Sequence, residues 1–210
     1  MRGSSCSCAR FGEPCNRFCA SLKEETRTLL CAGSQKRCIP CGTWGERKKL
    51  EDQAIIIQEG MAIVAIPRET NSIGVAVLSP GNIVNIVGLS EGLDANERMR
   101  WNRSHRAYIA QAVSGCRISC TDILKLAHER TDLSNALLQA ALSHYISSLT
   151  FSSSVSTMGS EQKVDWLLDQ LNDAGVDTTS IRHSDFAQML NMNRVTVTRA
   201  FGSVLSAKGL

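Results

Sequence analysis

The stretch Ser184–Arg199, with the sequence SDFAQMLNMNRVTVTR, holds two short segments with helical spacing of apolar residues. Ser184-Asp185 can cap a helix ahead of the first segment, and a polar break at Asn191–Asn193 precedes a second segment that begins at Arg194. Four apolar side chains are spaced to pack the two segments together: Phe186, Leu190, Val197 and Phe201. The stretch therefore predicts a helix, a short turn and a second helix.

The charge of this region differs from that of the whole chain. Residues 186–210 contain three basic residues, Arg194, Arg199 and Lys208, and no acidic one. The 210-residue chain carries a formal net charge of only +3, so its bulk charge does not indicate a nucleic-acid-binding protein. The second helix is thus expected to present a locally positive face, and any DNA-binding function must depend on this local motif.

Short runs of β-branched residues fill residues 53–118, and glycine, proline and asparagine separate them. This pattern is typical of antiparallel strands. It predicts a small β-sandwich or jelly-roll domain over residues 51–120. The expected strands are Ile55–Ile57, Ile63–Ile66, Ile73–Leu78, Ile83–Val87, Tyr108–Val113 and Cys116–Ser119.

Residues 121–158 are expected to be helical, because apolar residues recur there on one wide stripe. The spacing allows two interpretations, a core helix that covers the sheet or a helix that forms a dimer. For a dimer, the candidate contact residues are Leu138, Leu142, Tyr145 and Leu149. Residues 159–210 then form the helix-turn-helix domain.

Nine cysteines are present, and seven of them lie in the first 41 residues: Cys6, Cys8, Cys15, Cys19, Cys31, Cys38 and Cys41. The other two are Cys116 and Cys120. In a reducing compartment, clustered cysteines bind metal or sense redox state more often than they form structural disulfides. Residues 1–50 are therefore predicted to be a cysteine-rich sensory segment, and iron–sulfur, zinc and free-thiol chemistry all stay open.

Several function classes lack support in the sequence. The four histidines are scattered, and no catalytic triad, phosphate-binding loop or G-x-G-x-x-G motif is present, so no enzyme activity is expected. The chain has neither an apolar run of about 20 residues nor a signal-peptide core, which predicts a cytoplasmic protein without a membrane partner.

The helix-turn-helix stretch resembles that of the CRP/FNR family of bacterial transcription regulators. Leu78–Asn82 is similar to the Leu-x-Pro-Gly-Asp turn of this family, and Gly60 lies where the family has an earlier glycine turn. The resemblance implies an α+β protein with a β-roll sensor domain, a long dimerisation helix and a C-terminal helix-turn-helix. Wing strands would follow Leu210 in the family, so the wing is expected to be absent or truncated.

The resemblance also implies roles in DNA binding. Arg199 takes the position of an arginine that pairs with guanine, a contact worth about 1–3 kcal/mol of discrimination. Thr196 and Thr198 are candidates for contacts with a thymine methyl group or a phosphate, and Arg194 for a phosphate or a base. Val195 replaces a glutamate that accepts from cytosine, which predicts an operator that differs at that base.

The cysteines resemble those of the FNR-like branch, in which four of them hold a [4Fe–4S] cluster. Cys38-Ile39-Pro40 and Cys116-Arg117-Ile118 are similar to the segments around two ligands of that branch, and Cys15-x3-Cys19 is similar to a third. The resemblance implies a [4Fe–4S] cofactor. Its candidate ligands are Cys19, Cys31, Cys38, Cys41 and Cys116. The usual spacing is not reproduced, because Leu22 stands where that branch has a cysteine.

Partners follow from the same resemblance: double-stranded DNA, a second copy of the chain, and RNA polymerase for an activator. No cyclic nucleotide is expected, because no glutamate precedes Leu89 and Arg103-Ser104 is the only nearby Arg-Ser pair. The alternative is a thiol- or zinc-based interaction protein whose helix-turn-helix is vestigial.

Overall fold

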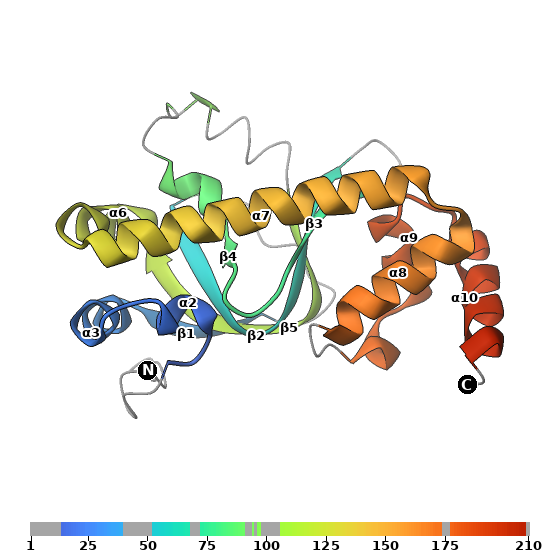
Figure 1. The fold of residues 1–210 in the computed structure, drawn as a ribbon, viewed down its shortest axis with the longest axis horizontal. Helices are drawn as coiled ribbons and strands as arrows, with labels where there is room; N and C mark the ends of the chain where they lie inside the picture. Colours follow the sequence, from blue (N-terminus) through green and yellow to red (C-terminus); the bar gives the residue numbers. More distant parts are fainter. Residues whose placement is uncertain are drawn as a thin grey trace.

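The computed structural model describes residues 14–39, 52–67, 72–90, 94, 96–97, 106–173 and 177–208. An antiparallel sheet forms the centre of the molecule, and helix α7 (Thr131–Thr157) runs along it from the N-terminal helices to a C-terminal helical unit (Figure 1). The predicted α+β class is therefore confirmed. Among the described helices, none combines the length and apolarity that a membrane span requires.

The sheet has the strand order β1-β5-β2-β3, and the short strand β4 pairs with β2. The bounds are β1 Gln35–Ile39, β2 Gln53–Pro67, β3 Ser72–Leu78, β4 Ile83–Val84 and β5 Arg106–Ser119. Two pairs of expected strands are thus single long strands. Gly60, at φ +85°, lies among register shifts between β2 and β5, so the strands bulge there without ending.

The turn after β3 has the geometry that its sequence predicts. Gly81 adopts φ +89°, a left-handed conformation that favours glycine, and its N–H donates to the Ile57 carbonyl at 2.9 Å. The Asn82 side chain accepts from the Ser79 N–H at 2.9 Å. The prediction of a strand over Ile83–Val87 is wrong at its C-terminal end. Asn85 adopts φ 63°, and a 3-10 helix, η1 (Ile86–Leu89), follows.

The predicted helical region divides into two helices. α6 comprises Cys120–Glu129, and the extended backbone of the next residue, Arg130, separates it from α7. Next come α8 (Ser160–Asp173), the 3-10 turn η2 (Thr178–Ser180), α9 (His183–Met189) and α10 (Arg194–Lys208).

The N-terminal segment is part of this fold. Helices α2 (Arg17–Ala20) and α3 (Glu24–Ala32) lead into β1, which pairs with β5 at the edge of the sheet. Phe18, Leu22 and Leu30 are buried in one core with residues of the sheet, α6 and α7. The described part of the cysteine-rich segment is therefore integrated with the sheet domain.

A second core joins the sheet to the C-terminal unit. Met61 and Ile63 of β2 and Phe151 of α7 are buried together with the apolar residues of α8, α9 and α10. The sheet, the long helix and the helix-turn-helix thus share one packed interface, which fixes the orientation of the last helices.

Candidate nucleic-acid interface and cysteine site

Helices α9 and α10 form the predicted helix-turn-helix. The turn between them is made by Asn191, at φ 51°, a left-handed conformation that asparagine tolerates better than most residues. The Met192 N–H donates to the Ala187 carbonyl at 2.9 Å, and the Asn193 side chain accepts from the Val195 N–H at 2.8 Å. Asn193 therefore caps α10, and the polar break in the sequence has a structural function.

Apolar packing sets the rotation of α10 about its own axis. Phe186, Leu190 and Val197 are fully buried, and the rings of Phe186 and Phe201 meet edge to face with centroids 4.7 Å apart. With this face of α10 turned inward, the side chains of Arg194, Val195 and Arg199 are exposed. Val195 is 57% exposed.

The two threonines of the predicted interface differ. Thr196 is half-buried, whereas Thr198 is exposed and donates from its hydroxyl to the Arg194 carbonyl at 3.0 Å. His183, which the sequence analysis did not single out, lies with Nδ1 3.1 Å from Thr198 Oγ1. Five predicted DNA-binding residues therefore lie within the first two turns of α10, and one histidine of α9 joins them.

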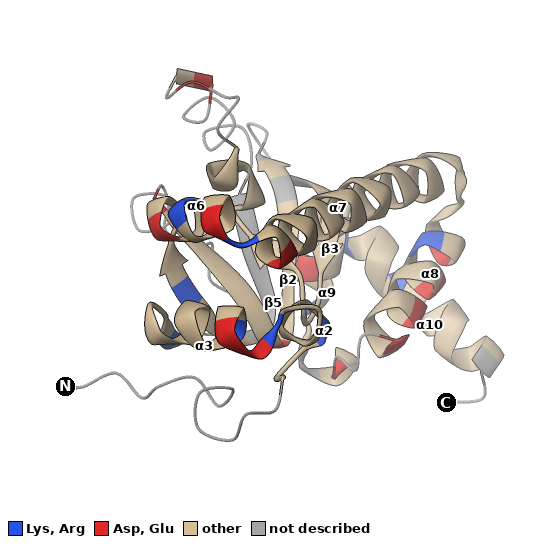
Figure 2. Ribbon diagram, turned by 60° about the vertical axis from the view of Figure 1, so that its left-hand side comes forward, with Lys and Arg blue, Asp and Glu red and all other residues tan. Residues whose placement is uncertain are grey.

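The charges are distributed unevenly over the C-terminal unit. Helix α10 carries no acidic residue, while α8, which packs against it, carries Glu161, Asp165, Asp169 and Asp173 (Figure 2). An anionic ligand such as DNA is thus favoured at the exposed face of α10 over the surface of α8.

Three cysteines lie in one group, and two of them contact one buried amide. The Sγ atoms of Cys15 and Cys19 are 3.6 Å apart. The Gln58 side-chain amide donates to Cys15 Sγ at 3.1 Å and to Cys116 Sγ at 3.2 Å. Cys19, Cys116 and Gln58 are buried, so this group lies between α2 and the sheet.

The structure separates the predicted cluster ligands. Cys19 and Cys116 lie in the group around Gln58, and Cys31 of α3 is buried in the same core. Cys38 is exposed on edge strand β1, opposite Ser114. Cys41 lies outside the described residues.

Cys15 and Gln58 were not among the predicted site residues. Cys15 could have been found from its spacing of four residues from Cys19, but nothing in the sequence marks Gln58. Cys120 is buried in the core close to Gly88.

Among the described residues, the cysteines as placed do not form a four-thiolate [4Fe–4S] site. Such a cluster takes four thiolates, and the Gln58 amide lies between two of the three sulfurs that converge. Over the described ranges, no three Cys, His, Asp or Glu side chains form a group that could hold a metal ion. The same arrangement fits a pair of reduced thiols, because Cys15 and Cys19 are neighbours.

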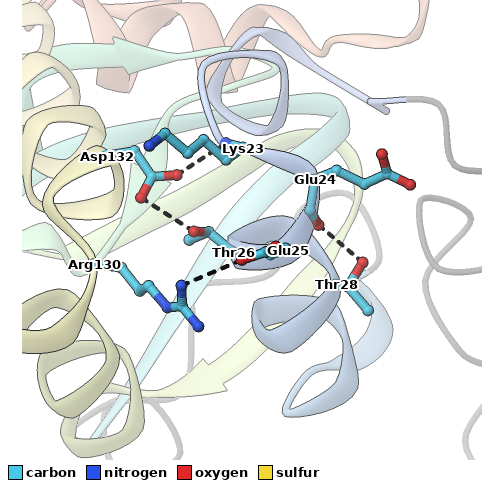
Figure 3. Close-up of polar contacts among 7 residues, drawn as sticks. All are labelled: Lys23, Glu24, Glu25, Thr26, Thr28, Arg130 and Asp132. Atoms are coloured by element: carbon cyan, nitrogen blue, oxygen red, sulfur yellow. Dashed lines mark hydrogen bonds and ion pairs between the residues drawn. The ribbon is translucent and has the colours of Figure 1, made fainter.

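Polar contacts connect the N-terminal helices to α7 (Figure 3). The Asp132 carboxylate, in the first turn of α7, accepts from the Lys23 N–H at 2.9 Å and from the Thr26 hydroxyl at 3.1 Å. Desolvation opposes ionisation of Asp132, but these two donors outweigh it and hold its pKa below the ordinary value. Asp132 thereby caps α3 from another helix.

Helix α7 has one buried face and one exposed apolar face, which match the two interpretations of its sequence, a core helix and a dimer-forming helix. Leu133, Ala136, Ala140 and Phe151 are buried. The candidate dimer residues Leu138, Leu142, Tyr145 and Leu149 are between 52% and 61% exposed. The helix therefore covers the sheet with one face and presents an apolar stripe with the other.

Comparison with solved structures identifies the fold. A transcriptional regulator assigned to the Crp/Fnr family from Eubacterium rectale superposes with a TM-score of 0.68 at 11% identity, over 94% of this chain and 90% of that one. The fold is that of the CRP/FNR regulators. The c-di-GMP-responsive global regulator CLP of Xanthomonas campestris gives a TM-score of 0.64 at 14% identity, over 90% and 94% of the two chains. FixK2 of Bradyrhizobium japonicum gives 0.65 at 13% identity, over 84% and 86%.

Of the three comparisons, the one with solved structures identifies the CRP/FNR fold. The sequence matches no protein-family model and no curated protein. This chain therefore shares with the solved regulators the arrangement of the sheet, the long helix and the helix-turn-helix.

Proposed function

We propose that this chain is a DNA-binding transcription regulator of the CRP/FNR type that reads duplex DNA with α10. One observation carries the proposal: the second helix of a firmly packed helix-turn-helix presents Arg194 and Arg199 on its exposed face, with no acidic residue on the helix. In this motif the second helix enters the major groove, where arginine pairs with guanine. RNA polymerase is the proposed further partner for activation.

The proposed regulator acts as a homodimer through α7. Leu138, Leu142, Tyr145 and Leu149 follow each other at spacings of four, three and four residues, which is the a/d pattern of a two-stranded coiled coil. The occupant of this stripe is a second copy of the chain. A dimer places two recognition helices against half-sites that lie about one turn of DNA apart.

A binding series with paired variants tests the DNA-binding proposal. The probe is a labelled duplex that the wild-type protein selects from a random-sequence pool, at low salt. Loss of an arginine–guanine pair costs about 1–3 kcal/mol, so Arg199→Ala is expected to weaken binding by roughly 5- to 150-fold. Lys163→Ala, on α8, is the matched control that keeps wild-type affinity. Equal affinities for Arg199→Ala and wild type would favour a vestigial helix-turn-helix.

The proposed input is the redox state of the cysteines, with a [4Fe–4S] cluster as the cofactor that the family resemblance implies. A cluster would require Gln58 to leave its position between the sulfurs and a fourth ligand to join Cys15, Cys19 and Cys116. Iron and sulfide analysis of protein purified without air tests this directly. A colourless, iron-free protein that still binds DNA would refute the cluster without affecting the DNA-binding proposal.

The geometry around Gln58 favours a second candidate, a dithiol sensor. Cys15 and Cys19 can form a disulfide when their sulfurs approach from 3.6 Å to about 2.05 Å. With hydrogen peroxide as oxidant, the two thiols and one peroxide give one disulfide and two molecules of water. Mass spectrometry of peroxide-treated protein tests this candidate: a loss of two hydrogens in the peptide that contains Cys15 and Cys19 supports it, and two free thiols refute it.

A further inference from the structure

His183 is held in a fixed position beside the recognition helix. It is the first residue of α9, and its ring stacks on Phe201 of α10 with centroids 4.5 Å apart and an interplanar angle of 20°. Its Nδ1 lies 3.1 Å from Thr198 Oγ1. Two contacts with α10 therefore determine where the second ring nitrogen, Nε2, lies.

The hydrogen bond from Thr198 to the Arg194 carbonyl favours the His183 tautomer that carries its proton on Nδ1. A threonine hydroxyl has one hydrogen, and Thr198 donates it to the Arg194 carbonyl at 3.0 Å. With the hydroxyl hydrogen on that carbonyl, Thr198 Oγ1 is the acceptor and His183 Nδ1–H the donor of the 3.1 Å contact. A neutral imidazole has only one N–H, so its Nε2 presents a lone pair, whereas protonation places a hydrogen and a positive charge at Nε2.

We propose that His183 is a further DNA contact, in which the protonated ring donates from Nε2 to a backbone phosphate, so that DNA affinity rises as the pH falls. The inference rests on the proposed function. The first helix of a helix-turn-helix crosses the DNA backbone while the second lies in the groove, and His183 begins that first helix next to Thr198. A phosphate oxygen repels the Nε2 lone pair of the neutral ring and accepts a charge-assisted hydrogen bond from the protonated ring.

Among the described residues of α9, α10 and the segment before η2, the carboxylates are engaged by other groups. Arg182, the residue before α9, pairs with Asp185 of α9 at 3.1 and 3.2 Å. Helix α10 contributes Arg194 and Arg199 and no carboxylate. Before η2, the Asp177 carboxylate accepts from the backbone and hydroxyl of Thr179.

Helix α8 also packs against α10 and carries Lys163 and the four acidic residues named above. The two arginines of α10 favour an anion at this edge of the motif. Because these arginines are already positive, a protonated His183 adds its charge to a surface that is positive without it.

The experiment measures salt dependence at two pH values. Each phosphate contact adds about 0.9 to the slope of log affinity against log salt for B-DNA. The wild-type protein is titrated by fluorescence anisotropy with the selected duplex at about pH 6 and about pH 8, between which histidine changes charge. We expect the wild-type slope to be steeper by about 0.9 at the lower pH and that of His183→Gln to be equal at both. His128→Gln, an exposed histidine on α6, is the matched control and should keep the wild-type difference.

A second variant gives an independent measurement. Thr198→Val removes the acceptor that holds the proton on Nδ1, so the neutral ring can carry its hydrogen on Nε2 and reach the phosphate at high pH. The pH dependence of Thr198→Val should therefore be smaller than that of wild type. This measurement decides the matter if thermal melts show that His183→Gln does not fold.

The outcomes separate the two proposals. An equal pH effect on the slope in wild type and His183→Gln, with binding still sensitive to Arg199→Ala, would overturn the histidine contact alone. An absence of DNA binding by the wild type at either pH would overturn both proposals.

Discussion

Gly74 in β3 lies directly against the main chain of Met189 in α9. A methyl group at position 74 would come within 2.6 Å of the Met189 carbonyl oxygen and 3.0 Å of Phe151 Cζ. The absence of a side chain at this position thus allows the helix-turn-helix to dock on the sheet. The sheet and the helix-turn-helix are close enough here for a change in one to displace the other.

Gly74→Ala is therefore expected to destabilise the protein by about 1–3 kcal/mol, the usual effect of overpacking a tight site. Urea denaturation followed by circular dichroism measures this change. The matched control is Gly202→Ala on α10, where a new methyl group meets nothing within 4 Å. Because glycine is a poor residue inside a helix, this control should stabilise by about 0.5–1 kcal/mol. Equal effects of the two substitutions would contradict the close approach at Gly74.

The Asp132 contacts predict a stability that depends on acid pH. The pKa of Asp132 lies below its ordinary value of 3.8 in the folded protein, so its ionised form stabilises the fold above about that pH and the contribution is lost as the pH falls further. Asp132→Asn should lower stability at neutral pH by about 0.5–1.5 kcal/mol, the usual worth of a hydrogen bond. The difference from wild type should shrink below about pH 4.

Glu25→Gln provides the comparison for Asp132→Asn. Glu25 of α3 pairs at 3.5 Å with Arg130, the residue before α7, but the Glu25 side chain is 82% exposed. Exposed pairs of this kind contribute little, so Glu25→Gln should change the midpoint of unfolding hardly at all. If both substitutions shifted it equally, general surface charge would account for the effect better than the capping contact.

The exposed stripe of α7 predicts dissociation by a single charge. Leu142 is 52% exposed in the isolated chain and occupies the middle of the a/d pattern. In a dimer, Leu142→Asp would bury a carboxylate in the seam, which should weaken dimerisation by more than about tenfold. Sedimentation velocity measures the change. Leu29→Asp, a 46% exposed leucine on α3, is the control and should leave the oligomeric state unchanged. A monomeric wild type would refute the dimer.

Local signals account for the parts of the fold that the sequence predicted correctly. The helix-turn-helix depends on neighbouring residues, the buried Phe186 and Val197 and the cap at Asn193, and its elements lie where expected. The strands were divided wrongly because Gly60 indicates a turn in the sequence, whereas the partner strand holds it in a bulge. A pairing between distant strands is decided by tertiary contacts, which the local pattern does not contain.

The candidate site also has a part that the local sequence predicted and a part that only tertiary contacts reveal. Arg194 and Arg199 were identified from a local motif and are exposed. The packing of the helix-turn-helix on Met61 and Ile63 had no sequence signal, because those residues also fit an ordinary strand core. Gln58 likewise became recognisable only when the sheet placed its amide between the sulfurs of two distant cysteines.

The amide of Gln58 predicts a change in the reactivity of Cys15. N–H donors stabilise the thiolate, which is the reactive form of cysteine, and a hydrogen bond to a charged group is worth about 1.5–3 kcal/mol. Gln58→Leu should therefore slow alkylation of Cys15 by iodoacetamide, by roughly tenfold or more. Quantitative mass spectrometry measures the rate, with exposed Cys38 on β1 as an internal reference whose rate should not change. A Cys15 rate that is unchanged relative to Cys38 would mean that the amide does not control the thiol, and a faster rate would mean that Gln58 chiefly shields it from the reagent.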